Sequence, residues 1–348
     1  MRDVAVVSFA QLPNTRSQDT RNEVEMLMPV IAEAIEGSGI PRKEIGFTVS
    51  GSCDYLVGAP FSFVTGLDAV GAWPPIQESH VEMDGAWALY EAWVRLQHGD
   101  VDSALVYSFG KSSLGPLRDI FVLQLDPYCA APLWPDTISV AALQARAWLD
   151  SGHDESEMAE VAVRSRRDAI ANPMAQLSGE AEPAALLKDP YVVSPLRRHD
   201  CPPLSDGAAA VVLAAGDLAR QVCERPAWIR GLDHRIEAHG LGVRDLTTSP
   251  STALAGRNVG AADVEVAELH APFTHQELIL REALGLGPRV SINPSGGALA
   301  ANAMMVAGLT RIGEAAQRII DGTAGSTLGH ATSGPCLQQN LVCVMEAR

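Results

Sequence analysis

The stretch "AELHAPFTHQEL" (residues 267–278), with "NPSGGALAANAMMVAGLTRI" (residues 293–312) after it, carries the strongest structural pattern in the chain. The apolar run that leads to His270 predicts a buried strand that ends in a loop. The proline and paired glycines at residues 293–297 predict a tight turn, and the apolar spacing beyond it predicts one long helix. The segment "GSTLGHATSGPCLQQNLVCVMEA" (residues 325–347) then predicts two strands joined by a turn.

The first half of the chain shows a similar order of elements. Residues 4–10 and 103–113 are short apolar runs typical of buried strands, and residues 22–37 have helical spacing. Between them, "ESHVEMDGAWALYEAW" (residues 78–93) predicts a strand that turns sharply into a helix at Asp84. This alternation predicts an α/β fold with a mostly parallel sheet covered by helices, and the similar order in both halves suggests an internal duplication.

A segment at about residues 115–200 interrupts this pattern. It is rich in proline and charge and has two helical patches. We therefore expect a long excursion over the sheet, which is a common way to build a pocket. The predicted organisation is an N-terminal half at residues 1–222, which includes the excursion, and a C-terminal half at residues 223–348.

The composition limits the classes of partner. The 348 residues are 47% hydrophobic with a net charge of −16, which is typical of a folded globular protein and argues against binding to nucleic acid or an anionic membrane surface. The first residues lack the pattern of a signal peptide, and no apolar stretch reaches the length of a membrane span. Six cysteines without CxxC spacing argue against a zinc site and a disulfide framework. We expect a cytoplasmic protein with no metal and no permanently bound cofactor.

Together these segments resemble the thiolase superfamily, in particular its sterol-carrier-protein thiolase (lipid-transfer-protein) branch. The stretch at residues 267–278 is similar to the "ELHDCF" segment of that branch, with His270 in the histidine position. Residues 293–312 are similar to its "NPSGG" turn and helix, and "SDGAAAVVLA" (residues 205–214) is similar to its "DGAAA" segment. The resemblance implies a thiolase fold, with two similar βαβαβαββ halves in five α-β-α-β-α layers, a dimer, and an acyl-CoA substrate.

Several catalytic groups of the family are replaced in this chain. Asp84 lies where the family has its acylated cysteine. The turn that holds the second cysteine of the family contains Thr332 here, and Cys336 follows that position by a few residues. The Gly-His-Pro histidine is absent, and Asn302 lies near that place. Thiolysis needs a thiolate that can carry the acyl group, whereas an aspartate is a weak nucleophile. The sequence therefore argues against ordinary thiolase activity.

The resemblance to the thiolase superfamily leaves three functions as alternatives. The first is a retro-aldolase, a C–C lyase that cleaves a branched 3-hydroxyacyl-CoA in steroid side-chain degradation, in a complex with a small OB-fold partner. Relatives of that kind use tyrosines where this chain has Thr332 and His270. The second is a non-catalytic subunit that forms a dimer with another thiolase-like chain. The third is an acyl-CoA acyltransferase that uses Cys336 or Cys129.

Four residues are the candidates for chemistry, and each also has a structural interpretation. Asp84 can act as a base, or it can cap the helix that follows. His270 and Asn302 can hold the thioester oxygen, and His330 can act as acid or base. His80 lies four residues before Asp84, so the two side chains share a face if the strand continues.

The candidates for CoA binding are the turn and a basic cluster. Ser295, Gly296 and Gly297 form a turn that allows close approach of the backbone to a ligand. Arg164 and Arg167 can meet the phosphates of CoA, although such a run is more often a solvated helix face. The sequence contains neither GxGxxG nor GxxxxGK, so it predicts no nucleotide-phosphate loop.

Overall fold

The computed structural model describes residues 2–348, and its N-terminal half contains one set of five strands. They are β1 (Val4–Gln11), β2 (Phe47–Gly51), β3 (Glu78–Val81), β4 (Ser103–Gly110) and β7 (Gly207–Ala215). They lie in the order β1-β7-β4-β2-β3. β2 is parallel to β3 and β4, whereas β7 is antiparallel to β1 and β4.

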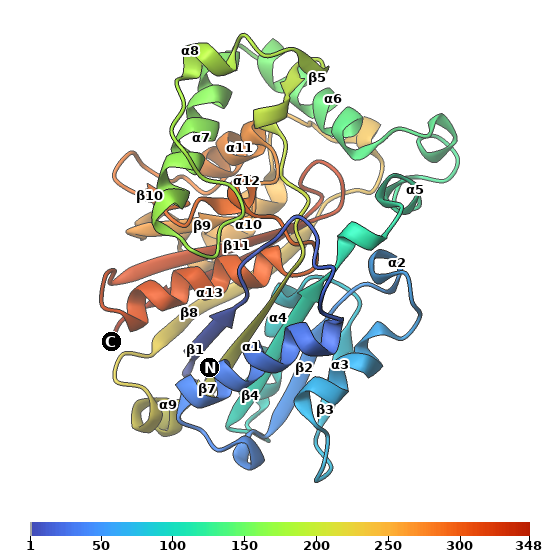
Figure 1. Ribbon diagram of the computed structural model, residues 1–348. Coiled ribbons are helices and arrows are strands. Elements are labelled where there is room, and N and C mark those ends of the chain that lie inside the picture. The colour runs from blue at the N-terminus through green and yellow to red at the C-terminus, as the bar shows by residue number, and fades with distance from the viewer. Residues whose placement is uncertain (1) are drawn as a thin grey trace.

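The C-terminal half repeats this arrangement. Its strands are β8 (Ala227–Ile236), β9 (Val266–Leu269), β10 (Ser291–Ile292), β11 (Ser326–Ser333) and β12 (Gln339–Glu346). They lie in the order β8-β12-β11-β9-β10, with β9 parallel to β10 and β11 and with β12 antiparallel to β8 and β11. The predicted pair of similar halves is therefore confirmed. The predicted mostly parallel sheet is wrong, because β7 and β12 each run antiparallel to both of their neighbours. A short antiparallel pairing of β1 with β8 joins them into one 10-stranded sheet (Figure 1).

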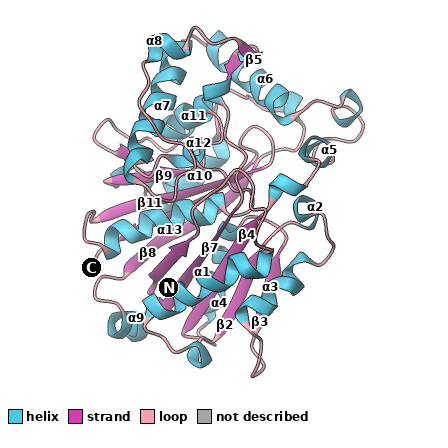
Figure 2. Ribbon diagram, in the orientation of Figure 1, coloured by secondary structure: helices cyan, strands magenta, loops and turns pink. Residues whose placement is uncertain are grey.

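The helices form three layers around the two halves of the sheet (Figure 2). The central layer consists of α4 (Gly85–His98) and α13 (Ala307–Ile320), whose apolar side chains pack between the strands of both halves. α1 (Glu23–Ser38) and α3 (Ser62–Val70) cover the other face of the N-terminal strands. α10 (Pro250–Val259) and α11 (Thr274–Ala283) cover the other face of the C-terminal strands, which completes the predicted five layers.

The side-chain alternation of the strands explains this layering. In β1, Val4 and Val6 face the central helices, whereas Ala5 and Val7 face α1. Successive side chains of a strand point to opposite faces, so a strand covered on both sides must be apolar throughout. The apolar runs in the sequence therefore reflect burial on both faces of the sheet.

The predicted excursion is present and covers one end of the C-terminal half, as the green segments of Figure 1 show. It contains α5 (Leu117–Val122), α6 (Thr137–Asp150), α7 (Glu155–Asp168), α8 (Pro183–Leu186) and a ribbon of β5 (Tyr191–Val193) and β6 (Leu196–Arg197). Both α6 and α7 pack on α11. The remaining short helices are α2 (Asp54–Val57), α9 (Gly216–Val222) and α12 (Gly297–Ala300). The proposed boundary at residues 222 and 223 falls between α9 and β8 and stays a prediction.

The prediction of one long helix after the Gly-rich turn is wrong. The helix stops after α12, and α13 begins only at Ala307. In the interrupting segment, Ala301 is extended, Met305 has a φ of 69°, and Ala303 forms an isolated bridge with Ser205. The chain leaves the helix because this tertiary pairing competes with the local helical preference. No helix within residues 2–348 has the length and apolar character needed to cross a membrane.

Candidate active site

Asp84 joins the N-terminal ends of the two central helices. Its Oδ1 accepts hydrogen bonds from the backbone N–H groups of Ala86 at 2.9 Å and Leu309 at 3.0 Å, and its Oδ2 accepts one from Gly308 at 2.9 Å. The side chain is 3% exposed. The first N–H groups of a helix lack intrahelical partners, and a carboxylate there also interacts favourably with the helix dipole. The structure therefore shows Asp84 as a cap of both α4 and α13.

Two glycines allow the helix ends to approach this closely. A Cβ atom at Gly85 would lie 2.8 Å from Cδ2 of Leu309 in α13, and one at Gly308 would lie 2.6 Å from Oδ1 of Asp84. Real Cβ contacts are longer than this, so a larger residue at either position would separate the helices. The backbone N–H of Gly85 also donates to Met305 O at 2.8 Å, which ties the turn to the segment before α13.

His270 and Asn302 form the polar pair of the site. His270 follows β9, and its Nε2 lies 3.2 Å from Oδ1 of Asn302. The backbone N–H of Thr332 points at Nδ1 from 3.4 Å, which assigns the ring proton to Nε2. Burial lowers the pKa of His270 below its ordinary value, and the charge of Asp84 opposes this shift. A neutral imidazole therefore holds the amide of Asn302 in place.

The amide nitrogen of Asn302 is the free donor of this pair. The backbone N–H of Asn302 donates to Ser205 Oγ at 3.0 Å, and its Oδ1 faces His270. No acceptor within residues 2–348 lies within hydrogen-bond distance of its Nδ2, although the residue is only 5% exposed and lines a cavity. The break between α12 and α13 places Asn302 here.

The cavity has a volume of about 390 Å³ and lies between the excursion and the ends of the central helices. Most of its wall is apolar. Its larger apolar side chains are Leu117, Phe121, Leu125, Ile138, Val140, Leu204, Phe273, Met304, Met305 and Leu337. Its polar side chains are Asp84, Arg118, Gln124, Asp136, Thr137, His270, Gln276, Asn302, Thr332 and Ser333. An apolar pocket with a few convergent polar groups is the usual form of a small-molecule site.

His330 lies outside this wall. It is 0% exposed on β11, and its Nε2 lies 3.1 Å from Oδ1 of Asn340. Burial lowers its pKa to about 3, so the ring is neutral near neutral pH. The structure thus brings Asp84, His270 and Asn302 together at one cavity and places His330 in the core beside them.

The thiols of the cavity are poorly suited to acyl transfer. Cys201 and Cys336 both line it, and burial raises the pKa of each thiol to about 12. A thiol with such a pKa carries almost no thiolate at neutral pH, and the thiolate is the nucleophile. Cys129 is exposed and is not part of the wall.

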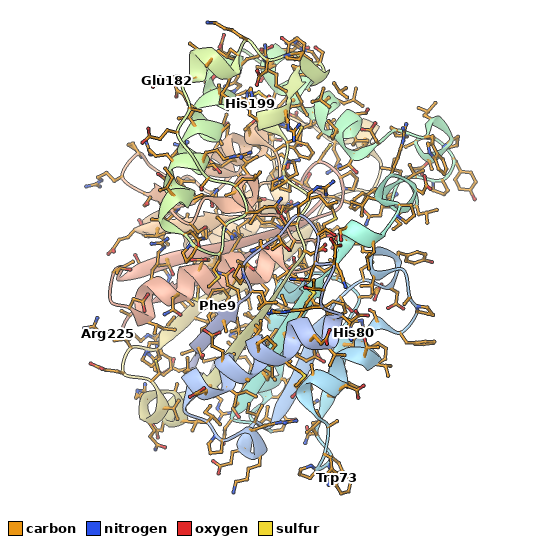
Figure 3. All side chains as sticks on the ribbon, viewed as in Figure 1. Phe9, Trp73, His80, Glu182, His199 and Arg225 are labelled. Atoms are coloured by element: carbon orange, nitrogen blue, oxygen red, sulfur yellow. The ribbon has the colours of Figure 1, made fainter. Side chains whose placement is uncertain are left out.

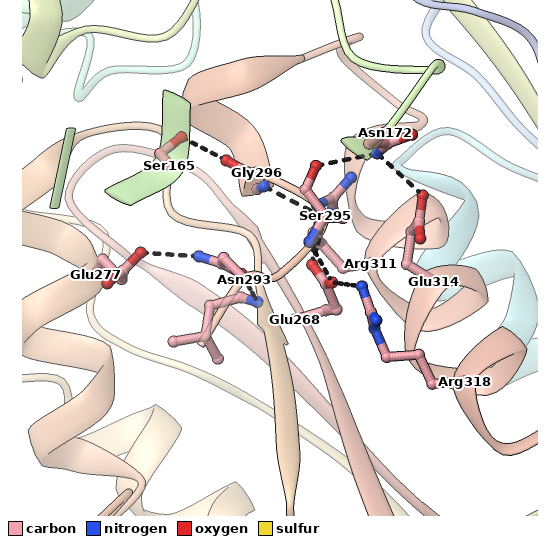
Figure 4. A network of polar contacts seen from close by, with 12 residues as sticks. Ser165, Asn172, Glu268, Glu277, Asn293, Ser295, Gly296, Arg311, Glu314 and Arg318 are labelled. Carbon is pink, nitrogen blue, oxygen red and sulfur yellow. Dashed lines mark hydrogen bonds and ion pairs between the residues drawn. The ribbon is translucent and has the colours of Figure 1, made fainter. Parts of the chain in front are cut away.

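The predicted CoA-binding turn belongs to a buried polar network instead of the cavity wall (Figure 4). Ser295 Oγ donates to Glu268 at 2.6 Å and accepts from Arg311 at 2.5 Å. Gly296 has a φ of 95°, and a Cβ there would lie 2.6 Å from the Cβ of Ala169 at the end of α7. Gly296 therefore allows the excursion to pack on the turn, whereas a Cβ at Gly297 would lie 2.9 Å from the side chain of Asn293 in the turn itself.

The two predicted arginines also lie away from the cavity. Arg164 forms an ion pair with the buried carboxylate of Glu277, and Arg167 pairs with Asp168 at 3.0 Å on the surface. Arg118, an exposed residue of α5, is instead the cationic side chain in the cavity wall.

The strand does not continue far enough for His80 to share a face with Asp84. β3 ends at Val81, so the two residues no longer share a face. Nδ1 of His80 lies 3.0 Å from Ser50 Oγ, and its Nε2 lies 3.3 Å from Glu82. β3 is the edge strand of the N-terminal half, and Figure 3 labels His80 there.

Sequence reasoning missed Asp136 and Arg118. Asp136 precedes a helix and its Oδ1 accepts from Ser139 N at 2.7 Å, so the sequence contained the signal of an N-cap but none of a cavity. Within residues 2–348, no group of three His, Cys, Asp or Glu side chains is arranged to hold a metal ion.

Known proteins with related sequences or structures include thiolases and lyases, although no protein-family model matches the chain. An acetyl-CoA acetyltransferase of Methanothermobacter thermautotrophicus is 26% identical over 93% of this chain and 92% of its own length. A 17-hydroxy-3-oxo-4-pregnene-20-carboxyl-CoA lyase of Mycobacterium tuberculosis is 29% identical over 48% of this chain and 52% of its own.

Two solved structures share the fold over nearly the whole chain. An Ltp2-ChsH2(DUF35) aldolase has a TM-score of 0.82 at 19% identity and covers 99% of this chain and 98% of its own. A Bacillus anthracis acetyl-CoA acetyltransferase has a TM-score of 0.79 at 15% identity, and the match covers 100% of this chain and 99% of that protein's chain. The chain has a thiolase fold, and its sequence is similar to that of acetyl-CoA acetyltransferases and of a CoA lyase.

Proposed function

We propose that this protein is a C–C lyase that cleaves a branched 3-hydroxyacyl-CoA by a retro-aldol reaction. The observation that carries the proposal is the cavity itself. It keeps a polar pair, His270 and Asn302, in an apolar wall, but the nucleophile position holds a capping aspartate and the nearby thiols are protonated. Such a site can stabilise an enolate but has no group to carry an acyl chain.

The reaction needs no group beyond the substrate and a proton acceptor. A base takes the proton of the 3-hydroxyl, the bond between C2 and C3 breaks, and C3 becomes the carbonyl of a ketone or aldehyde. The electron pair moves into the thioester as an enolate, which a proton at C2 converts to the shorter acyl-CoA. Asn302 Nδ2 is the donor for the developing oxyanion, and His270 orients it.

In this proposal Asp84 is a positioning residue. Both of its oxygens accept backbone N–H groups, which hold the ends of α4 and α13 against the cavity. The apolar wall suits a bulky acyl group, and the name of the related mycobacterial lyase supports a steroid side chain as its source. Arg118 is the cationic side chain best placed for the phosphates of CoA.

The proposed assembly includes a second protein. The Ltp2-ChsH2(DUF35) aldolase, which shares the fold, is a complex of two proteins by its name. We therefore expect this chain to pair with another thiolase-like chain, its own copy included, and with a small OB-fold partner. The acyl-CoA substrate is expected to bind in the cavity of this chain.

A second candidate is a non-catalytic thiolase-like subunit. The observation that favours it is the full use of the Asp84 carboxylate as a helix cap, because a silent scaffold would need the cap and no free base. An acyl-CoA acyltransferase is the weakest of the three functions, because burial raises the pKa of the thiols at the cavity to about 12.

The test is product analysis by mass spectrometry of a branched 3-hydroxyacyl-CoA incubated with the protein, alone and with its co-purifying partner. No free CoA is added, because thiolysis consumes CoA and a retro-aldol cleavage does not. Release of a ketone or aldehyde with a shorter acyl-CoA supports the lyase. Cleavage that needs the partner and is unchanged by Asn302→Ala in this chain supports the scaffold, and no cleavage by any combination refutes the lyase for this substrate class.

A further inference from the structure

We propose that Asp136 recognises a hydroxyl group on the acyl chain of the ligand and, in the lyase reaction, accepts its proton. This inference rests on the proposed function for its chemical step, but its binding component can be tested alone. It also assigns the ligand to a class: acyl groups that carry a hydroxyl, in preference to unsubstituted chains.

Asp136 lines the cavity and uses only one of its two carboxylate oxygens within residues 2–348. It is the N-cap of the 14-residue helix α6, where Oδ1 accepts the backbone N–H of Ser139 at 2.7 Å. No donor within residues 2–348 lies within hydrogen-bond distance of Oδ2, although the side chain is only partly exposed and lines the cavity. Burial raises the pKa of Cys201, another residue of the wall, and the negative charges of Asp200 and Asp136 add to this shift.

Within residues 2–348, Asp84 is the one other carboxylate of the wall. Asp84 uses both oxygens to cap helices. Gln276 Oε1 accepts the backbone N–H of Phe273 at 3.4 Å, and its Nε2 donates to Gln144 at 3.0 Å. The hydroxyl of Thr332 donates to Gln339 O at 3.0 Å.

The cavity wall therefore contains two different polar groups, an amide and a carboxylate. Asn302, in the segment before α13, lines the cavity, and its Nδ2 has no acceptor within residues 2–348. Asp136 supplies a charged acceptor from α6, on the excursion. A ligand that matches both groups has a carbonyl oxygen and a hydroxyl group on one chain, which is the chemistry of a 3-hydroxyacyl thioester. An unpaired carboxylate in an apolar wall disfavours a chain without a hydroxyl, because the charge would lose hydration without a new partner.

In the chemical step, the proton moves from the substrate hydroxyl to Oδ2 of Asp136 as the bond between C2 and C3 breaks. The electron pair remains on C2 as the enolate that Asn302 stabilises. The proton taken by Asp136 then returns to C2, directly or through water. Atoms and electrons balance without an oxidant, a reductant or free CoA.

The test uses Asp136→Ser, because serine is also a good N-cap and removes the charge without removing the cap. Asp154→Ser is the matched control, since Asp154 caps the 14-residue helix α7 in the same way and lies outside the cavity wall. The probes are two alkyl thioethers of CoA that differ only in a 3-hydroxyl. They lack the thioester carbonyl and are not cleaved, so titration calorimetry measures binding alone.

We expect the wild type and Asp154→Ser to prefer the hydroxylated probe by about tenfold to a hundredfold, the range of a hydrogen bond to a charged group. Asp136→Ser should lose this preference. A preference that survives in Asp136→Ser overturns the inference, and so does a wild type that binds neither probe or binds both equally.

Cleavage of the thioester separates this inference from the proposed function. If the wild type cleaves and Asp136→Ser cleaves equally fast, the lyase stands and the role of Asp136 fails. If nothing cleaves but the hydroxyl preference depends on Asp136, the recognition stands and the lyase fails.

Discussion

Substitutions at Asp84 should lower stability in proportion to the backbone hydrogen bonds that they remove. The carboxylate accepts three N–H groups at 2.9–3.0 Å in a position that is 3% exposed. Asp84→Ala leaves all three donors buried without an acceptor. Asp84→Asn keeps one oxygen for Ala86 and Leu309, but its NH₂ group faces the N–H of Gly308, so two donors oppose each other.

The magnitude follows from these bonds. A hydrogen bond to a charged group contributes about 1.5–3 kcal/mol, and loss of a helix N-cap alone costs about 1 kcal/mol. Because the three bonds share one carboxylate, their losses are not additive, and we expect about 3–5 kcal/mol for Asp84→Ala, the range for a broken buried charge interaction. For Asp84→Asn, which loses one bond and gains a repulsive contact, we expect about 1–3 kcal/mol.

Urea unfolding followed by circular dichroism measures these losses, provided that the slope of the transition is unchanged. Asp154→Ala is the control, since it removes an exposed cap of one helix only and should cost clearly less. If Asp84→Ala unfolds within about 1 kcal/mol of the wild type, or loses no more stability than the control, the double-cap interpretation is refuted.

Three other substitutions test separate features. Burial lowers the pKa of His275 from 6.5 to about 3, so the unfolded state takes up a proton at a higher pH than the folded state does. The contribution of the neutral His275 to stability is therefore present above the unfolded pKa and is lost as the pH falls. Between about pH 7.5 and about pH 5.5, the free energy of unfolding of His275→Leu should therefore fall by about 1.4 kcal/mol less than that of the wild type. An equal fall in the wild type and the variant would contradict this. Arg311→Met leaves the buried Glu268 carboxylate without its 3.1 Å partner and should lower the free energy of unfolding by about 3–5 kcal/mol. Replacement of both residues by methionine should cost less, because no buried charge is left behind. A double variant that is less stable than the single one would refute this. Gly110→Ala places a Cβ 2.0 Å from a backbone oxygen of the segment before α13 and should cost about 1–3 kcal/mol. The control Gly287→Ala meets no atom within 4 Å, so equal melting temperatures for the two variants would disprove the close approach.

Much of the fold could be predicted because it depends on local patterns. The turn and helix around Asp84 follow from an N-capping residue, a glycine and the apolar spacing of the helix, whereas the half-buried strand β3 before them is not an apolar run. The strands of both halves were visible as apolar runs because helices cover both of their faces. The long helix was predicted wrongly, because a bridge between Ser205 and Ala303, far apart in the sequence, interrupts it.

The sequence by itself determined the α/β halves and the strand that leads to His270, because each depends on neighbouring residues. Only the tertiary structure decided what these residues do. Asp84 meets Gly308 across 224 positions, and the cavity combines Asp136 of the excursion with Asn302 of the second half. Contacts of this kind arise from the packing of layers, and no periodicity in the sequence encodes which side chains the packing leaves without a partner.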